Sequence, residues 1–345
     1  MTPGAPHRST PGLTGRAPRP RFAYLLLTHT DPGQVEELAD RLLALSPSAQ
    51  VVVHHDRAAG DPPWDGRPDG PRHLVERGPV LWGDWSMVEA TERLVGYAVD
   101  QLDADWLVLL SGQHRPLVDL ARWEEVTAAS GVDAYARADR LPDRLRFGRA
   151  DPEANGYLAR ARHRWTAVRR PRSDRIHDAL GRLTQLGQAA HPLGAVEYAH
   201  RRGAWVLGTP RRRGPVAGWT LFRGSQWVVL NRRAARTVLE VDPAVRRWFR
   251  SSWIPDESYI HTVLRHQRGL VVSDQLVTYV LDTPSQPRPG WMRLAMDDLP
   301  AAWSSGAAFA RKVDLSDRPE VVWAIDRAVD QGRTTVPAAP SRGLG

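Results

Sequence analysis

The first third of the chain alternates between short apolar runs and amphipathic stretches. Mainly apolar runs occupy Phe22–Thr28, Gln50–His55 and residues 106–110. Runs of this length predict buried strands. Apolar residues recur at helical spacing over residues 35–45, between the first two runs, which predicts a helix. Because a strand, a helix and a second strand at this spacing form a βαβ unit, the chain is expected to contain a parallel sheet.

A second helix is predicted before the third strand. Ser86 and Glu89 have the spacing of a capping box, so the helix is expected to run from Met87 to about Leu102. Ligands of such sheets bind beyond the carboxyl ends of the strands. We therefore expect three segments to converge on one crevice, namely residues 28–29, 54–56 and 111–114.

After about residue 135 the pattern becomes less regular. Residues 137–172 are dense in arginine with scattered aromatic residues. The periodicity predicts helices over residues 173–190, 233–239 and 256–266, and strands over 205–207, 225–230 and 270–280. The α/β pattern predicts one domain over residues 22–333, with a Rossmann-like nucleotide-binding half (22–135) and an acceptor-binding half (136–333). Residues 1–21 and 334–345 are expected to be flexible tails, the first of them basic.

Composition narrows the class of protein. The chain has 345 residues, of which 42% are hydrophobic and 25% charged, as in ordinary globular proteins. It has no cysteine, which excludes disulfides, zinc–thiolate sites and a cysteine nucleophile. No apolar run has the length of a membrane span, and the first residues have no apolar signal-peptide core. A cytoplasmic protein is expected, and its oligomeric state is left open.

The net charge of +8 comes almost entirely from arginine. A basic surface attracts nucleic acid, anionic lipid or a small phosphorylated substrate. Arginine-rich segments at 137–172 and 211–213 would support a nucleic-acid-binding protein, but no recognised nucleic-acid motif accompanies them, so no nucleic-acid partner is expected. A basic surface could also contact an anionic membrane peripherally.

Five segments occur in a fixed order along the chain: residues 82–90, 109–117, 224–227, 255–258 and 309–312. Together they resemble the core-2/I-branching N-acetylglucosaminyltransferase and peptide xylosyltransferase family over roughly residues 22–314. The resemblance implies a GT-A type glycosyltransferase fold and a UDP-sugar donor, with GlcNAc or xylose as the transferred sugar. It also implies inversion at the anomeric carbon and independence from a metal or other cofactor.

Glu257, in the segment Ile254-Pro255-Asp256-Glu257-Ser258, is the predicted catalytic base. Inverting transfer needs one base to take a proton from the acceptor hydroxyl, and a carboxylate within hydrogen-bond reach suffices. The resemblance assigns that role to Glu257. The alternative role is an acid that stabilises a helix N-terminus. Asp256 is expected beside it, as a capping or acceptor-lining residue.

Lys312 is the predicted ligand of the donor diphosphate. Without a metal, the charge that develops on the leaving group can be stabilised by lysine or arginine, and the resemblance assigns this contact to Lys312. Arg288 is the expected basic partner by spacing, with Arg293 as the alternative, whereas Arg311 is expected to be a solvated neighbour.

Residues at the strand ends are expected to hold the nucleotide sugar. They are His29, Asp56, Ser111, Gly112 and Gln113. The family pattern has an Asp followed by an aromatic residue where this chain has His114 and Arg115, which puts donor choice in doubt.

A second group is expected to line the acceptor and sugar site. It comprises Trp82, Asp84, Ser225, Gln226, Trp227 and Asp256. Two of these have an alternative structural role, since Asp84 could cap a helix and Trp227 could belong to the core.

No metal site is predicted. His54, His55 and Asp56 could ligate zinc or iron and support a hydrolase, but neighbouring side chains on a strand point to opposite faces. The Asp-x-Asp match at Asp103 and Asp105 precedes its strand, the wrong end for a metal-dependent enzyme of this fold, and predicts a helix-to-strand turn. A catalytically inactive scaffold of the same family is the remaining alternative. For an active enzyme, a carbohydrate, a glycolipid or a small natural product is the expected acceptor.

Overall fold

The computed structural model describes most of the chain. The described residues are 19–64, 70–142, 152–168, 197–201, 204–211, 213–281 and 292–340, with a few isolated positions between 173 and 182. Arg288 and most of the helix predicted at 173–190 lie outside the described residues.

The predicted α/β class is confirmed by a mixed central sheet. Within the described residues its seven strands have the order β13-β6-β12-β4-β1-β2-β3. Their bounds are β13 (Val272–Ser273), β6 (Ala134–Tyr135), β12 (Val229–Asn231), β4 (Trp106–Ser111), β1 (Phe22–Thr28), β2 (Gln50–His55) and β3 (Arg72–Leu74). Strand β1 pairs in parallel with β2 and β4, which confirms the predicted parallel sheet, whereas β12 runs antiparallel to β4.

Alternation along β1 explains why both faces of the sheet are covered. Ala23, Leu25 and Leu27 pack into one hydrophobic cluster with helix α2 (Trp85–Asp100). Phe22, Tyr24 and Leu26 point to the other face and pack into a second cluster with helix α1 (Pro32–Leu45). A strand that is buried on both faces is a continuous apolar run, as this one is.

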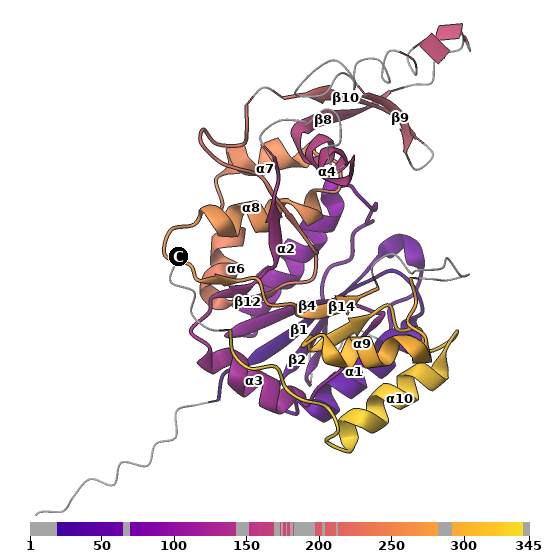
Figure 1. The fold of residues 1–345 in the computed structure, drawn as a ribbon, viewed down its shortest axis with the longest axis vertical. Coiled ribbons are helices and arrows are strands. Elements are labelled where there is room, and N and C mark those ends of the chain that lie inside the picture. The colour runs from indigo at the N-terminus through magenta and orange to yellow at the C-terminus, as the bar shows by residue number, and fades with distance from the viewer. Residues whose placement is uncertain are drawn as a thin grey trace, which may run out of the picture.

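Helices form one layer on each face of the sheet (Figure 1). One layer holds α2, α6 (Arg232–Leu239), α7 (Pro243–Arg250) and α8 (Tyr259–His266). The other holds α1, α3 (Leu120–Ala129), α9 (Leu299–Ser304) and α10 (Pro319–Asp330).

Two helix starts differ from the sequence prediction. Helix α1 begins at Pro32, because Asp31 caps it by accepting from the Gln34 amide. Helix α2 begins at Trp85, and its cap is Asp84, which accepts from the Ser86 amide at 2.9 Å. The capping box predicted at Ser86 is therefore wrong: an acid two residues earlier satisfies the first free amides.

The second half of the chain forms shorter strands than its pattern predicts. The predicted strand 225–230 is replaced by β11 (Phe222–Gly224) and β12, and 270–280 by β13 and β14 (Thr278–Val280). The segment around Trp205 is a strand as predicted, β10 (Ala204–Pro210), in a small sheet with β8 (His163–Val168) and β9 (Glu197–Arg201). Helix α4 (Pro152–Arg162) leads into β8, and β7 (Ala138–Arg140) pairs with β11.

One small sheet joins distant parts of the chain. Strand β15 (Phe309–Arg311) lies between β14 and β5 (His114–Pro116). Ala310 pairs with Arg115, and Arg311 with His114. This pairing brings the segment that contains Lys312 to the carboxyl end of β4.

Candidate active site

The carboxyl ends of β1, β2 and β4 meet as predicted. In the register of the sheet, Thr28 is opposite His55, and Leu27 is opposite Ser111. The Thr28 hydroxyl lies 2.8 Å from His55 Nδ1, and the Asp56 amide donates to the Thr28 carbonyl oxygen at 2.8 Å. The predicted convergence of the three strand ends is therefore confirmed.

Asp56 organises the loop at this edge. Its Oδ1 accepts from the Ala58 amide at 3.0 Å and from the Val80 amide at 3.1 Å. The carboxylate is buried and fixes the segment before α2 against the end of β2. Its contacts within the described residues are thus structural, whereas the predicted contact to a nucleotide stays a prediction.

A cavity of about 340 Å³ opens beside these strand ends. His29, Gly112 and Gln113 line it, together with Arg293 and Asp314. Three of the predicted donor-binding residues therefore share one cavity.

The pKa of His29 reports the charges around that cavity. Partial burial of the ring lowers this pKa most, and the nearby charges of Arg311 and Lys312 lower it further. The charge of Asp56 acts in the opposite direction. At neutral pH the ring is therefore uncharged and can take part in hydrogen bonds.

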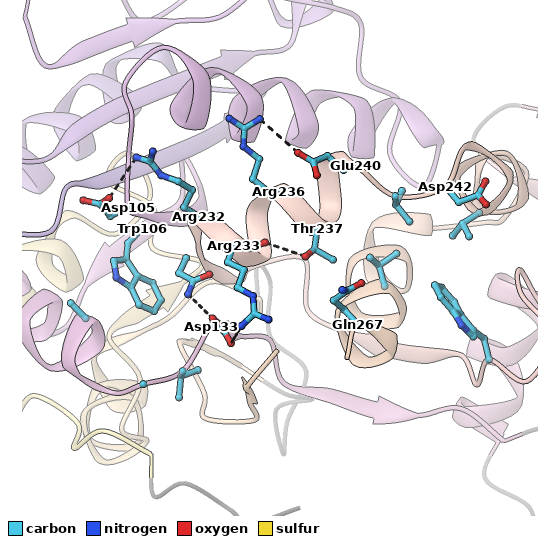
Figure 2. Close-up of a pocket in the computed structure, with 18 of the residues that line it drawn as sticks. Asp105, Trp106, Asp133, Arg232, Arg233, Arg236, Thr237, Glu240, Asp242 and Gln267 are labelled. Carbon is cyan, nitrogen blue, oxygen red and sulfur yellow. Dashed lines mark hydrogen bonds and ion pairs between the residues drawn. The ribbon is translucent and has the colours of Figure 1, made fainter. Parts of the chain in front are cut away.

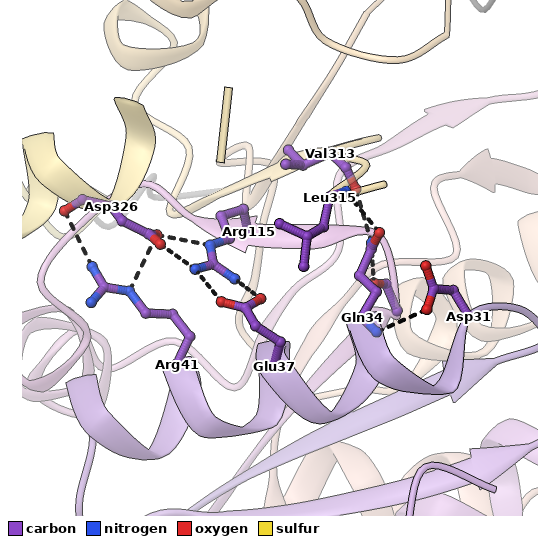
Figure 3. A network of polar contacts seen from close by, with 9 residues as sticks. Asp31, Gln34, Glu37, Arg41, Arg115, Val313, Leu315 and Asp326 are labelled. Carbon is purple, nitrogen blue, oxygen red and sulfur yellow. Dashed lines mark hydrogen bonds and ion pairs between the residues drawn. The ribbon is translucent and has the colours of Figure 1, made fainter. Parts of the chain in front are cut away.

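Gln34 on α1 holds the walls of this cavity together. Its Nε2 donates to the Gly112 carbonyl at 2.7 Å and to the Val313 carbonyl at 3.0 Å. Its Oε1 accepts from the Leu315 amide at 2.9 Å. Figure 3 shows this side chain reaching from α1 to the segment after β15.

Lys312 follows β15 directly and is the only lysine of the chain. Burial lowers the pKa of its amine, and the positive charges of Arg311 and Arg293 lower it further. Arg293 is held by Asp314, with Nε 2.9 Å from Oδ2. Of the two predicted partners of Lys312, Arg293 therefore lies within electrostatic reach, and Arg288 lies outside the described residues.

The expectation that Arg311 is solvated is wrong. Its Nε donates to the Ser111 hydroxyl at 3.1 Å, and its guanidinium carbon lies 4.8 Å from the ring centre of Trp227. Burial lowers the pKa of Arg311 to about 10. Pairing of β15 with β5 turns this side chain inward. Because β15 has only three residues, its sequence pattern does not indicate that orientation.

His114 and Arg115 stand where the family pattern has an Asp followed by an aromatic residue. Both side chains are buried. The His114 ring lies between the Ser111 amide, at 2.8 Å, and Trp227, at a ring distance of 4.8 Å. Arg115 points away from the strand ends and pairs with Glu37 of α1 and Asp326 of α10 (Figure 3). In this structure Arg115 is therefore a structural cation rather than a donor contact.

Arg311 lines a larger cavity, of about 780 Å³. Its walls include five of the residues predicted to line the acceptor and sugar site, together with the predicted base. These residues are Trp82, Ser225, Gln226, Trp227, Asp256 and Glu257. The structure thus brings together residues that are up to 175 positions apart (Trp82 and Glu257, 257 − 82).

Glu257 is the last residue of a single 3₁₀ turn, η2 (Pro255–Glu257). The helix predicted over residues 256–266 is confirmed as α8, but it begins after Glu257, at Tyr259. The Glu257 side chain is 32% exposed, and its Oε2 lies 4.0 Å from Arg160 Nη1. Burial raises the pKa of this carboxyl group, whereas the charges of Arg160 and Arg223 lower it.

The turn that carries Glu257 is braced by the segment before α2. The Ile254 amide donates to the Gly83 carbonyl at 3.0 Å, and the Trp82 and Trp253 rings meet edge to face at 6.4 Å. Ile254 has φ 50°, an uncommon value for a β-branched residue. A Cβ at Gly83 would lie 3.3 Å from Ile254, so glycine permits this close approach.

The remaining predicted acceptor residues differ in their contacts. Asp84 caps α2 and does not line the cavity, so its predicted sugar contact gives way to its alternative role. The Ser225 hydroxyl accepts from the Trp227 amide at 3.3 Å, and its carbonyl accepts from His261 Nε2 at 2.8 Å. Gln226 and Asp256 are buried at the cavity wall.

Sequence reasoning missed an aromatic–cation stack beside Glu257. The Tyr157 ring lies between the guanidinium groups of Arg160, at 4.6 Å, and Arg223, at 4.1 Å. Tyr157, Arg223 and Arg137 all line the cavity. The alternation of arginine and aromatic residues after 137 indicates that such stacks can form. It does not indicate which arginines face the cavity.

The two metal-type motifs are engaged in protein contacts. His54 Nε2 accepts from the Gly78 amide at 3.2 Å, and His55 contacts Thr28. Asp103 and Asp105 form the predicted turn between α2 and β4, where they pair with Arg21 and Arg232. In the part of the chain that the structure describes, no group of three or more His, Cys, Asp or Glu residues is placed to hold a metal ion.

A third cavity, of about 1150 Å³, lies at the opposite edge of the sheet around α6 (Figure 2). Arg232, Arg233 and Arg236 line it, and each pairs with a carboxylate: Asp103, Asp133 and Asp100 respectively. Because these charges are already compensated, the volume of this cavity does not make it the active site.

Arg211, in the arginine-rich segment 211–213, is a structural residue. Its guanidinium stacks on Trp248 at 4.1 Å and donates to the His163 carbonyl and the Ser251 hydroxyl.

No helix among the described residues combines the length and the apolar character needed to cross a membrane.

Comparison with known proteins identifies the chain's relatives. The family model described as Core-2/I-Branching enzyme matches residues 22–167 and 202–296. No curated protein sequence matches the chain.

Solved structures similar to this chain include two of the galactosyltransferase LgtC. One is a complex with donor and acceptor sugar analogs (11% identity, 91% of this chain and 97% of that chain, TM-score 0.35) and the other an active-site variant (10%, 91% and 96%, 0.37). A third is described as a glucose-1-phosphate thymidylyltransferase from Bacillus anthracis in complex with sucrose (10%, 73% and 86%, 0.31).

Proposed function

This chain belongs to the Core-2/I-Branching enzyme family and is a glycosyltransferase, and we propose that it transfers a sugar from a UDP-sugar to an acceptor hydroxyl with inversion. Glu257 is the catalytic base in this proposal, and Lys312 contacts the donor diphosphate. GlcNAc or xylose is the proposed sugar. The acceptor is a carbohydrate, a glycolipid or a small natural product.

The proposed reaction is a single displacement. The acceptor oxygen forms a bond to the anomeric carbon on the face opposite the leaving group, while the bond from that carbon to the diphosphate oxygen breaks. The proton of the acceptor hydroxyl goes to the Glu257 carboxylate, and the electron pair of the broken bond stays on UDP. One base and one displacement invert the anomeric configuration, without a covalent intermediate.

The observation that carries this proposal is the position of Glu257. Its carboxylate lies at the wall of the 780 Å³ cavity, partly shielded from water and next to two arginines. A base needs an ionised carboxylate and room for a substrate hydroxyl within hydrogen-bond distance. The cations keep the carboxylate available, and the cavity provides the room.

The strand-end cavity supports the donor half of the proposal. His29, Gly112 and Gln113 line it, and Lys312 places positive charge beside it. Fixed cations next to a leaving diphosphate stabilise the charge that develops there. We propose that Lys312 takes the place of a divalent metal, and the engagement of Asp103 and Asp105 with two arginines at the other sheet edge supports this.

Substitution of the base tests the proposal. In Glu257→Gln, sugar transfer is expected to fall by about 100- to 10,000-fold, the contribution of a general base, while UDP affinity stays unchanged. The matched control is Glu125→Gln, because Glu125 lies on the surface of α3 and pairs only with Arg122 among the described residues. Full transfer by Glu257→Gln, with Glu125→Gln also active, would exclude Glu257 as the base.

Ligand binding separates the donor from the acceptor question. UDP at a hundred times its Kd is expected to stabilise the fold by about 2.7 kcal/mol, and a panel of UDP-sugars identifies the donor by the largest thermal shift. Transfer is expected to persist in a metal chelator. Absence of any shift with UDP would count against a nucleotide-sugar enzyme.

A further inference from the structure

The cavity at Glu257 carries more cationic groups than its proposed reaction uses. Arg137, Arg223 and Arg311 line it, and the acidic residues in its walls are Asp139, Asp256 and Glu257. If Glu257 is the base, its charge is consumed when it takes the acceptor proton. The remaining cations must then be explained by contacts within the protein or by a substrate.

The positive charge of Arg223 is balanced by contacts within the protein. Its Nη2 lies 3.5 Å from Asp139 Oδ2, and its guanidinium stacks on Tyr157 at 4.1 Å. It also contributes to the charge around Glu257. Arg223 is therefore part of the wall, with a carboxylate partner at the rim.

The positive charge of Arg311 is not balanced in this way. Its contacts are neutral, namely the Ser111 hydroxyl and the face of Trp227. No carboxylate among the residues that the structure describes lies within ion-pair distance of it. A shielded guanidinium without an acid is costly, because buried charges are normally paired. A negatively charged group on a bound substrate would remove this cost.

The position of Arg311 separates it from Lys312. The two residues are adjacent at the end of β15, but Arg311 is a wall of the Glu257 cavity, under Trp227. Lys312 is outside those walls, and its main chain pairs with Met292 and Leu294. The proposed diphosphate contact thus falls to Lys312, and Arg311 is free to bind a group on the acceptor side.

Arg137 adds a second positive group to the same cavity. It is exposed and has no carboxylate partner within the described part of the chain. Its carbonyl oxygen would lie 2.4 Å from a Cβ at position 224, so Gly224 allows this segment to pack closely at the cavity wall. An anion that enters the cavity would therefore meet one cation at the rim and another at the wall.

We propose that the acceptor carries an anionic group, such as a phosphate, sulfate or carboxylate, which Arg311 binds while the acceptor hydroxyl lies at Glu257. This inference rests on the proposed transferase function and specifies its substrate class. Arg311 suits such a group, because a guanidinium can donate two parallel hydrogen bonds to a planar or tetrahedral oxyanion.

Calorimetry with UDP-saturated protein tests the inference. The probes are N-acetylglucosamine, its 6-phosphate and 6-sulfate, and glucuronic acid. Because charge-assisted hydrogen bonds contribute about 1.5–3 kcal/mol, at least one anionic sugar is expected to bind about tenfold or more tighter than the neutral one. Arg311→Gln is expected to abolish this preference and leave UDP affinity within about twofold. Arg122→Gln, an exposed arginine of α3, is the matched control and is expected to change neither.

Several outcomes overturn the inference. It fails if wild-type protein binds all four sugars equally, or if Arg311→Gln keeps the preference. It also fails if Arg311→Gln lowers the affinity for UDP by tenfold or more, which would assign the guanidinium to the diphosphate. A further contrary result is that Arg311 discriminates only UDP-glucuronate from UDP-glucose, which would assign it to the donor sugar. Absence of UDP binding by the wild type would instead overturn the proposed function. A UDP thermal shift in each variant shows that it is folded.

Discussion

Glu257 has to reconcile two opposing requirements. Shielding from water makes its carboxylate a stronger base by raising its pKa, but an acid whose pKa is raised too far is protonated and inactive at neutral pH. The two guanidinium groups beside it, Arg160 and Arg223, lower the pKa again. Tyr157 stacks between them and sets their positions. The stack therefore tunes the base without contacting the reaction.

Removal of one guanidinium tests this tuning. In Arg160→Gln the pKa of Glu257 is expected to rise. Because the base acts as the carboxylate, the acidic limb of the pH profile of kcat/KM then moves to higher pH. The shift should be about one pH unit or less, since both groups are about a third exposed and such pairs contribute about 1 kcal/mol or less. Arg160→Lys keeps the charge and should keep the limb in place. A limb that stays put in Arg160→Gln would show that the arginine does not act on the base.

At the scale of elements, the βαβ half was predictable and the second half was not. Strands β1, β2 and β4 follow from apolar runs that are buried on both faces. The short strands of the second half pair across long sequence separations, as when β15 joins β5 and β14. A strand of three residues has too little pattern to be recognised, so the inward turn of Arg311 could not be predicted.

Arg115 shows the same limit in one side chain. It links β5 to α1 through Glu37, 78 positions away, and to α10 through Asp326, 211 positions away. The sequence indicated only that Arg115 departs from a family motif. In the structure it pairs with Asp326 and so ties α10 to β5, the strand that pairs with β15 (Figure 3).

Arg115→Met is therefore expected to destabilise the fold. Its guanidinium is nearly inaccessible to water, so its removal leaves Glu37 without its cation and Asp326 with Arg41 as its remaining partner. The expected loss is roughly 3 kcal/mol, the lower end of the range for a broken buried pair, because the two carboxylates are partly exposed. Urea denaturation measures it, with the surface variant Arg122→Met as control. A loss no larger than that of the control would show that α10 does not depend on this network.

At the scale of the whole molecule, the two edges of the sheet use arginine differently. At the amino edge, around the cavity of Figure 2, arginines of α6 are paired with aspartates of α2 and of the turn before β4. At the carboxyl edge, Lys312 has no carboxylate within ion-pair distance among the described residues, and its charge acts on His29. The uncompensated charge is thus concentrated where an anionic donor is proposed to bind.

Because the chain has a single lysine, this concentration can be measured in the intact protein. Lys312 and the α-amino group are the only primary amines, so an amine-reactive ester labels two sites that peptide mapping distinguishes. The lowered pKa of Lys312 leaves more of it as free amine near neutral pH, and its labelling is expected to be faster than that of an ordinary lysine. UDP at a hundred times its Kd should slow labelling of Lys312 by up to about 100-fold and leave the α-amino group unaffected. Lys312→Arg should take label at the α-amino group alone and bind UDP more weakly, because arginine does not reproduce the compact ammonium group. Labelling of Lys312 that UDP does not slow would place the diphosphate elsewhere in the molecule.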